Sequence, residues 1–258
     1  MQTELPCPTS PDSTTWKTVF EKFGQSPEAI IGRIQKHVSQ RKALFAAVYA
    51  SLGDVAGKRI VEIGCGTALE CLIFALRGAQ CVGVDYESAA LRYAAGARSL
   101  FAEAIPLSFC QGTGFMIPLK DNCADLVLSQ GFLEHFTPEQ TAALLQEQCR
   151  ILKAGGVLLV DVPNHDSPYE LYKRIYTLFR PWIYGKERGI RRGEINAQCA
   201  ALGMRSVARY GWSFKGYPFK NPLDFLFMLP LLTARSVLSL VNAAHDSIGM
   251  VFIKGSRQ

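Results

Sequence analysis

The chain has 258 residues, of which 48% are apolar, so it can bury one large core. Its eight cysteines include no C-x-x-C pair, which argues against a disulfide framework or a zinc site and favours a reducing compartment. The net charge of +6 gathers between Lys173 and Lys220, where the sequence has eleven basic and two acidic residues. That local excess favours an anionic carrier or a membrane surface as a partner, and an ordinary solvated surface explains it equally well.

The two ends of the chain differ in character. Residues 1–15 are rich in Pro, Ser and Thr and lack the charged start and apolar core of a secretory signal, so we expect a disordered tail. The most apolar stretch, residues 223–241, contains Asp224, Pro230 and Arg235 and falls short of the roughly 20 apolar residues of a membrane span. We therefore expect a cytoplasmic protein with one domain over residues 16–258 that touches membranes only peripherally.

Short β-branched segments alternate with segments of helical period, which is typical of a parallel sheet covered by helices on both faces. The expected strands are 59–63, 80–84, 107–110, 124–129 and 156–162, and the expected helices are 27–52, 68–77, 88–102 and 138–153. The last of these helices begins after Thr137, a favourable N-cap, and the turn Ala154-Gly155-Gly156 closes it.

The pattern changes after Pro163. An aromatic, basic stretch at 169–184 precedes an expected helix at 192–202, a strand at 205–210, a mixed apolar segment and a last strand at 249–254. The whole predicts an α/β fold: a doubly wound, Rossmann-like, mostly parallel sheet of seven strands, the last antiparallel. Helical insertions at about 165–190, after strand five, and 211–245, between strands six and seven, are expected to form a cover on the acceptor side.

The strand 59–63 runs into Gly64-Cys65-Gly66-Thr67-Ala68 before a helix begins. Glycines at such a turn let a ligand approach the backbone and its amide N–H groups at a helix N-terminus. Glu62, just before the turn, suits an ammonium group and not a pyrophosphate, which favours an amino-acid-like cofactor. A dinucleotide site would need a glycine where the sequence has Leu69.

The second strand ends at Asp85, nineteen residues after Gly66, where a carboxylate can accept both hydroxyls of a ribose. VEIGCGTA followed by VGVDY resembles motif I of class I S-adenosylmethionine-dependent methyltransferases and its following acid. PLKDNCADLVLSQGFLEHF and ILKAGGVLLVDVPN resemble later parts of that pattern, in the same order and spacing. The chain is similar to the broad small-molecule group that includes quinone-biosynthesis methyltransferases. The resemblance implies S-adenosyl-L-methionine as the cofactor.

The resemblance also implies which positions contact the cofactor: Glu62, Gly64, Cys65, Gly66, Ala68, Asp85, Tyr86, Thr113, Gly114, Phe115, Gln130 and Gly131. Two of them depart from the family pattern. Ala68 stands where a third glycine is usual, and Thr113 stands where an acid often contacts the adenine amino group. Tyr86 is placed to pack on the adenine, and a role in the core is its alternative.

By the same resemblance, Glu134 and His135 face the cleft after the fourth strand. His135 is a candidate base for an acceptor hydroxyl, because its unperturbed pKa is near 6.5, and a structural role is the alternative. The candidate acceptor residues follow the fifth strand, at the edge where open α/β sheets bind ligands: Asn164, His165, Tyr169 and Tyr172. Their aromatic surroundings favour a greasy or aromatic acceptor, unless these rings only cap the sheet. No metal is expected.

We therefore expect methyl transfer from S-adenosyl-L-methionine to a small or lipid-like acceptor, at oxygen more than at carbon. Two alternatives stay open, and a third is weaker. A cyclopropane-forming fatty-chain methyltransferase also carries an acid–histidine pair after the fourth strand, and a non-catalytic cofactor-binding scaffold subunit would tolerate Ala68 and Thr113. A nucleic-acid methyltransferase is disfavoured, because no N-P-P-Y or D-P-P-Y motif follows the fourth strand.

Overall fold

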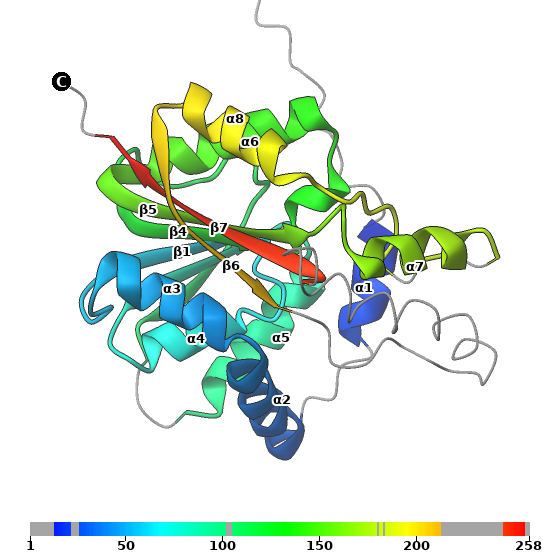
Figure 1. The fold of residues 1–258 in the computed structure, drawn as a ribbon. Helices are drawn as coiled ribbons and strands as arrows, with labels where there is room; N and C mark the ends of the chain where they lie inside the picture. The colour runs from blue at the N-terminus through cyan, green and yellow to red at the C-terminus, as the bar shows by residue number, and fades with distance from the viewer. Residues whose placement is uncertain are drawn as a thin grey trace, which may run out of the picture.

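A computed structural model describes residues 13–21, 26–101, 105–179, 181–182, 184–212 and 245–255. Its centre is a seven-stranded sheet in the order β3-β2-β1-β4-β5-β7-β6 (Figure 1). The strands are β1 Arg59–Ile63, β2 Gln80–Asp85, β3 Leu107–Gln111, β4 Ala124–Gln130, β5 Leu152–Pro163, β6 Met204–Trp212 and β7 Ser247–Lys254. Strand β7 is antiparallel to β5 and β6, and the other pairs are parallel. The predicted fold class is confirmed.

Helices cover both faces of this sheet (Figure 1). One face carries α3 Lys42–Leu52, α4 Leu69–Ala75 and α5 Ser88–Ser99, with α2 Pro27–Gln40 packed on α4. The other face carries α6 Pro138–Ile151 and α8 Arg192–Ala201. Two further helices, α1 Ser13–Glu21 and α7 Pro168–Thr177, lie to one side of the sheet, and a 3₁₀ turn, η1 Leu133–His135, follows β4.

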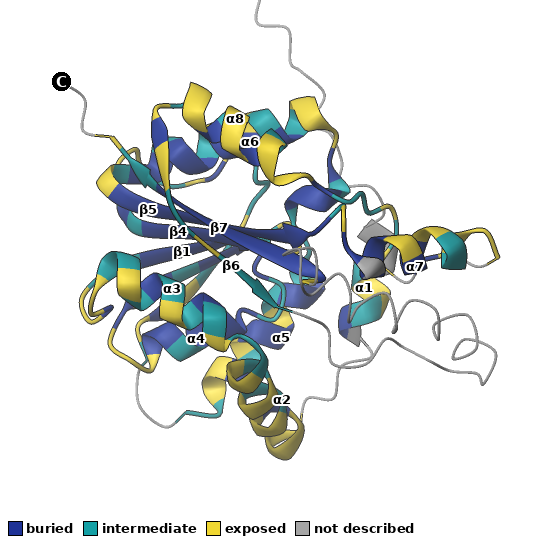
Figure 2. Cartoon of the chain, in the orientation of Figure 1, coloured by how far each residue is buried: buried dark blue, intermediate teal, exposed yellow. Residues whose placement is uncertain are grey.

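Alternation along the strands divides the core into two apolar layers. Successive residues of a strand point to opposite faces, so Ile60 of β1 packs on the α3–α5 side while Val61 and Ile63 pack on the other side. The central strands are buried and the outward faces of the helices are exposed (Figure 2). Because both faces are covered, the carboxyl edge of the parallel strands is the place where loops meet.

Two predicted helices differ from the observed ones. The expected helix 27–52 is split into α2 and α3 at Arg41, whose φ of −101° and ψ of 17° interrupt the helix and whose guanidinium lies 3.7 Å from the centre of the Trp212 ring. The helix after Thr137 has the predicted cap, with the Thr137 side chain accepting from the backbone N–H of Gln140. It ends at Ile151, however, and Gly155 belongs to β5 instead of closing the helix.

The structure describes parts of the predicted tail and of the predicted cover. Residues 13–15 of the expected tail lie in α1, while residues 1–12 lie outside the described residues. The first insertion contains α7, and residues 213–244 of the second lie outside the described residues. None of the helices that the structure describes has the length and apolarity needed to cross a bilayer.

Candidate functional site

A cavity of about 260 Å³ lies where the loops after β1, β2, β3 and β4 meet. Nine of the predicted site residues line it: Gly64, Gly66, Asp85, Tyr86, Thr113, Gly114, Phe115, Gly131 and His135. Helix α1 adds two aromatic rings to its wall, those of Trp16 and Phe20. Four loops that are separate in sequence therefore share one cavity at the carboxyl edge of the sheet.

The first loop depends on glycine. Gly64 and Gly66 have backbone φ angles of +65° and +51°, which residues other than glycine rarely adopt. A Cβ atom on Gly64 would also lie 2.5 Å from the Phe132 ring, and one on Gly66 would lie 3.2 Å from the Phe20 ring. Bare backbone at these two positions leaves room for a ligand to approach the start of α4.

Asp85 connects the loop after β1 to the loop after β2. Its Oδ2 accepts a 2.8 Å hydrogen bond from the N–H of Gly66, and its Oδ1 accepts one of 2.8 Å from the N–H of Glu87. Burial raises the pKa of Asp85, and these backbone N–H groups oppose the shift. A carboxylate offers about four lone-pair sites, so Asp85 can still accept hydroxyl donors from a ligand in the cavity.

The loop after β3 supplies a polar group without a partner. The hydroxyl of Thr113 is buried and has no hydrogen-bond partner among the described residues. A buried hydroxyl usually finds a partner, so a ligand in this cavity would satisfy it. Tyr86 also lines the cavity and is 47% exposed, which contradicts the alternative in which Tyr86 is a core residue.

Glu62 does not reach the cavity wall, contrary to prediction. Its side chain is buried, and its Oε2 accepts a 3.2 Å hydrogen bond from the backbone N–H of Cys71, in the first turn of α4. Because the N-cap residue Ala68 makes no side-chain cap, Glu62 satisfies one of the N–H groups of that turn that have no partner within the helix. Burial and the nearby Glu70 raise the pKa of Glu62.

Three other predicted cofactor residues also lie outside the residues that line the cavity: Cys65, Ala68 and Gln130. Cys65 and Ala68 are buried, and a Cβ on Gly83 would come within 2.9 Å of the Cys65 sulfur, so this side chain faces the sheet. Ala68 has a φ of +50°, in the left-handed region that alanine disfavours.

His135 lines the cavity and is oriented by a backbone carbonyl. Its Nδ1 lies 2.8 Å from the carbonyl oxygen of Lys186. A carbonyl only accepts, so Nδ1 carries the hydrogen and Nε2 of the neutral ring is an acceptor. Burial lowers the pKa of His135, against the Lys186 carbonyl and the charge of Glu187, which raise it. The neutral imidazole therefore predominates at pH 7.

Glu134 is not among the residues that line the cavity, so only His135 of the predicted pair lines it. Its side chain is buried, and burial followed by the charge of Glu187 raises its pKa well above the usual range. In a 3₁₀ turn with three residues per turn, neighbouring side chains point about 120° apart, which separates Glu134 from His135.

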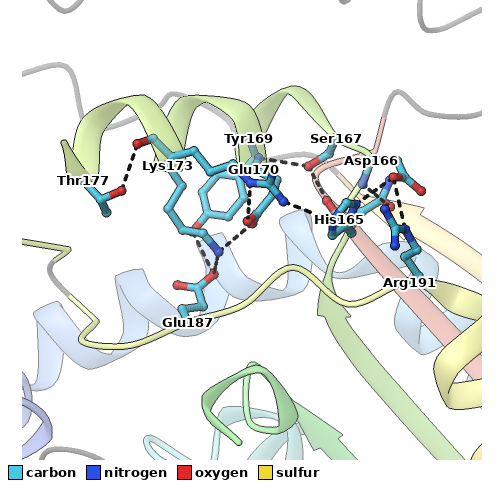
Figure 3. Close-up of polar contacts among 11 residues, drawn as sticks. His165, Asp166, Ser167, Tyr169, Glu170, Lys173, Thr177, Glu187 and Arg191 are labelled. Atoms are coloured by element: carbon cyan, nitrogen blue, oxygen red, sulfur yellow. Dashed lines mark hydrogen bonds and ion pairs between the residues drawn. The ribbon is translucent and has the colours of Figure 1, made fainter. Parts of the chain in front are cut away.

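The predicted acceptor residues stabilise α7 and do not line the cavity. Asn164 donates to the carbonyl of His245. His165 lies 2.8 Å from Asp166 (Figure 3) and 3.0 Å from the guanidinium of Arg174. The other two, Tyr169 and Tyr172, are buried in ring contact with Trp182. In the described part of the chain these side chains have structural partners, so their role toward an acceptor stays a prediction.

Several residues that line the cavity were not predicted from the sequence. Trp16 packs edge-on against His135, with ring centres 5.5 Å apart, and stacks on Tyr184 at 6.0 Å. The rings of Phe132 and Phe136 also line the cavity, with their centres 5.1 Å apart. The four-residue spacing of Trp16 and Phe20 indicates one helix face, but nothing local indicates which part of the chain that face covers.

Comparison with known proteins bears on this site. Residues 61–160 match the family model described as a methyltransferase domain. Ubiquinone biosynthesis O-methyltransferase of Bradyrhizobium sp. (strain ORS 278) is 34% identical to this chain over 119 residues, which are 45% of this chain and 44% of that protein. A probable S-adenosylmethionine-dependent methyltransferase of Mycolicibacterium smegmatis is 29% identical over 42% of this chain and 39% of that one. Residues 61–160 therefore match a methyltransferase domain, and similar proteins are named as S-adenosylmethionine-dependent methyltransferases.

The alignments span less than half the length of these relatives. Solved structures with the fold of this methyltransferase domain match more of the chain. The magnesium protoporphyrin IX methyltransferase of Synechocystis PCC 6803, solved with bound SAH, has a TM-score of 0.65 at 14% identity over 93% of each chain. A sarcosine dimethylglycine methyltransferase from Galdieria sulphuraria, named as such provisionally, has a TM-score of 0.60 at 16% identity over 85% of this chain and 88% of that one.

Proposed function

We propose that this chain transfers the methyl group of S-adenosyl-L-methionine to a hydroxyl oxygen of a small or lipid-like acceptor. The observation that carries the proposal is the cavity in which the glycine loop, Asp85 and His135 meet. Relatives named ubiquinone biosynthesis O-methyltransferases support oxygen as the methylated atom. The donor supplies an activated methyl group, because its sulfur is a sulfonium.

The residues that line the cavity fit such a donor. The bare backbone of Gly64 and Gly66 would face its amino-acid end, and Asp85 would accept its ribose hydroxyls. The half-exposed ring of Tyr86 offers a flat surface for the adenine, and the unpartnered hydroxyl of Thr113 offers it a hydrogen bond. This set of groups replaces the acid that the family often uses for the adenine.

His135 is the residue we propose for the proton. Its Nε2 would accept the hydrogen of the acceptor hydroxyl while the oxygen takes the methyl group, which requires the neutral ring. The rings of Trp16, Phe132 and Phe136 line the same part of the cavity and would exclude water. Alignment in such a dry site supplies as much as about 7 to 11 kcal/mol of barrier reduction, so the base has a modest share of the work.

The acceptor would be greasy or aromatic, because the cavity wall around His135 is made of rings. We further propose that α7 brings the chain to an anionic membrane surface or carrier. Leu178 and Phe179 follow α7 and are 77% and 76% exposed, close in sequence to the exposed Arg174. Lys173 does not contribute, because its side chain is buried against Glu170.

Methyl transfer is tested with a donor that carries a deuterated methyl group. The purified chain is incubated with this donor and an extract of its own cells, and products are analysed by mass spectrometry. We expect a greasy or aromatic product that gains the labelled methyl group with wild type, and much less of it with Asp85→Ala at the same donor concentration. Donor binding without any labelled product would contradict the activity and favour a cofactor-binding scaffold.

A further inference from the structure

Three consecutive residues, Lys186-Glu187-Arg188, connect the His135 turn to the helices on its side of the molecule, and we call them the strap. Each residue of the strap makes a different contact. The carbonyl of Lys186 accepts the Nδ1 hydrogen of His135, as described above. Glu187 and Arg188 are each held in place by contacts of their side chains.

Glu187 fixes the strap to α7 and the loop after it. Its Oε2 accepts a 2.6 Å hydrogen bond from Trp182 Nε1, and its Oε1 accepts from the hydroxyl of Tyr169 at 3.3 Å. The ammonium group of Lys173 lies 3.4 Å from the same Oε1 (Figure 3). The side chains of Glu187 and Lys173 are each 5% exposed, so little solvent competes for these contacts.

Arg188 fixes the strap to η1, α6 and α8. Its backbone N–H donates to the carbonyl of Glu134 at 3.0 Å, and its Nε donates to the carbonyl of Phe136 at 2.6 Å. Its Nη2 donates to the hydroxyl of Thr141 at 3.0 Å, and Glu194 pairs with both terminal nitrogens at 2.6 and 2.9 Å. Arg188 thus contacts the residues on both sides of His135, Glu134 through its backbone N–H and Phe136 through its guanidinium.

We propose that Glu187 and Arg188 are positioning residues that hold the Lys186 carbonyl on His135 and so select the tautomer with hydrogen on Nδ1 and a lone pair on Nε2. The significance of that tautomer for catalysis rests on the proposed function. Glu187 and Arg188 follow Lys186 directly and are both held by their side chains. The Lys186 carbonyl therefore cannot turn away from the His135 ring without breaking the contacts of these two residues. Loss of one such hydrogen bond changes a tautomer ratio by roughly 2- to 12-fold.

Nitrogen-15 NMR of the imidazole rings measures the tautomer directly, on the chain without donor or acceptor. The sequence has four histidines, and His135→Gln assigns the signal of interest. We expect Nδ1 to carry the hydrogen in wild type at neutral pH. Arg188→Gln should lower the ratio of the Nδ1–H to the Nε2–H form by roughly 2- to 12-fold, Arg188→Lys should restore part of it, and Arg205→Gln, an exposed change at the start of β6, should leave it unchanged.

Transfer kinetics give the second measurement. Arg188→Gln should lower kcat and leave the donor KM unchanged, since it does not touch the cavity. If Arg188→Gln fails to fold, Glu194→Gln decides, because it removes one partner of Arg188 and keeps the guanidinium. A wild-type ring with hydrogen on Nε2, or folded variants with a wild-type His135 signal, would overturn the proposal. A correct wild-type tautomer in a chain that transfers no methyl group would contradict the proposed function alone.

Discussion

At the residue scale, Asp85 shows how a single acid can serve both the fold and a ligand. Its two oxygens hold the N–H groups of Gly66 and Glu87, and the same carboxylate lines the cavity. Asp85→Ala should weaken donor binding by about 1.5 to 3 kcal/mol, the usual contribution of hydrogen bonds to a charged group. Isothermal titration calorimetry measures this loss of affinity, with Asp125→Ala as control. Asp125 lies at the start of β4, accepts a hydrogen bond from the backbone N–H of Arg59, and does not line the cavity. Equal donor affinity in wild type and Asp85→Ala would mean that the ribose is held elsewhere.

The second prediction concerns the charge of His135. Burial lowers the pKa of His135 from its ordinary value of 6.5, and proton removal requires the neutral ring. The transfer rate should therefore persist at pH 6.5 and fall only as the pH drops further, through that lowered pKa. His135→Gln should lower the rate by about 10²- to 10⁴-fold and abolish this acid limb.

The control for this pH profile is His165→Gln. His165 is held between Asp166 and Arg174, outside the cavity, so its removal should leave the profile of the transfer rate unchanged. An acid limb that survives in His135→Gln would show that another group titrates, and His135 would then be a structural residue of the turn.

At the element scale, the loop between β1 and α4 contains a local conflict. Ala68 adopts a φ of +50° just before α4, where the family usually has glycine. The left-handed region costs a residue with a Cβ roughly 1 to 2 kcal/mol, and glycine loses about 0.4 to 1 kcal/mol through its freer unfolded state. Ala68→Gly should therefore raise the free energy of unfolding by up to about 1.6 kcal/mol. Urea denaturation checks this, and a loss of stability would contradict the left-handed assignment.

Elements of the central sheet were predictable because each carries its own signal. The strand before Gly64 and the capping residue Thr137 specify their structure through neighbours in sequence. Helix α7 lies inside the helical insertion predicted at about 165–190, but its bounds and the burial of Lys173 against Glu170 were not predicted, because the stretch looked like a basic surface. Pairs of this kind depend on the fold. Glu62 illustrates the same limit, since its bond to Cys71 N–H replaces a cap that only the structure shows to be missing.

Helix α7 also carries a prediction about membranes. Its end exposes Leu178 and Phe179, and an apolar surface flanked by cations binds anionic lipid in a salt-dependent way. Cosedimentation with anionic vesicles should fall with added salt and should be weakened when both residues are changed to serine. The matched control is Ile31→Ser, an exposed apolar residue on α2. If wild type and the double variant bind anionic and neutral vesicles equally, α7 does not dock on lipid.

At the scale of the whole molecule, the carboxyl edge of the sheet joins features that are far apart in the chain. Helix α1 comes from the first described residues, the glycine loop from the start of the matched methyltransferase domain, and the strap from beyond that domain. The cavity was predictable where the family pattern extends, through Gly131 and His135. The aromatic wall from α1 and the strap lie outside that pattern and depend on tertiary contacts, so only the structure places them.

Calorimetric titration of the wild-type chain shows whether this cavity binds the methyl donor. The glycine loop and Asp85 recognise parts that S-adenosyl-L-methionine and its demethylated product share. Both ligands should therefore bind with dissociation constants in the micromolar range, about 8 kcal/mol of binding free energy, and both should raise the melting temperature. The absence of heat and of any thermal shift with either ligand would contradict the assignment of this cavity to the methyl donor.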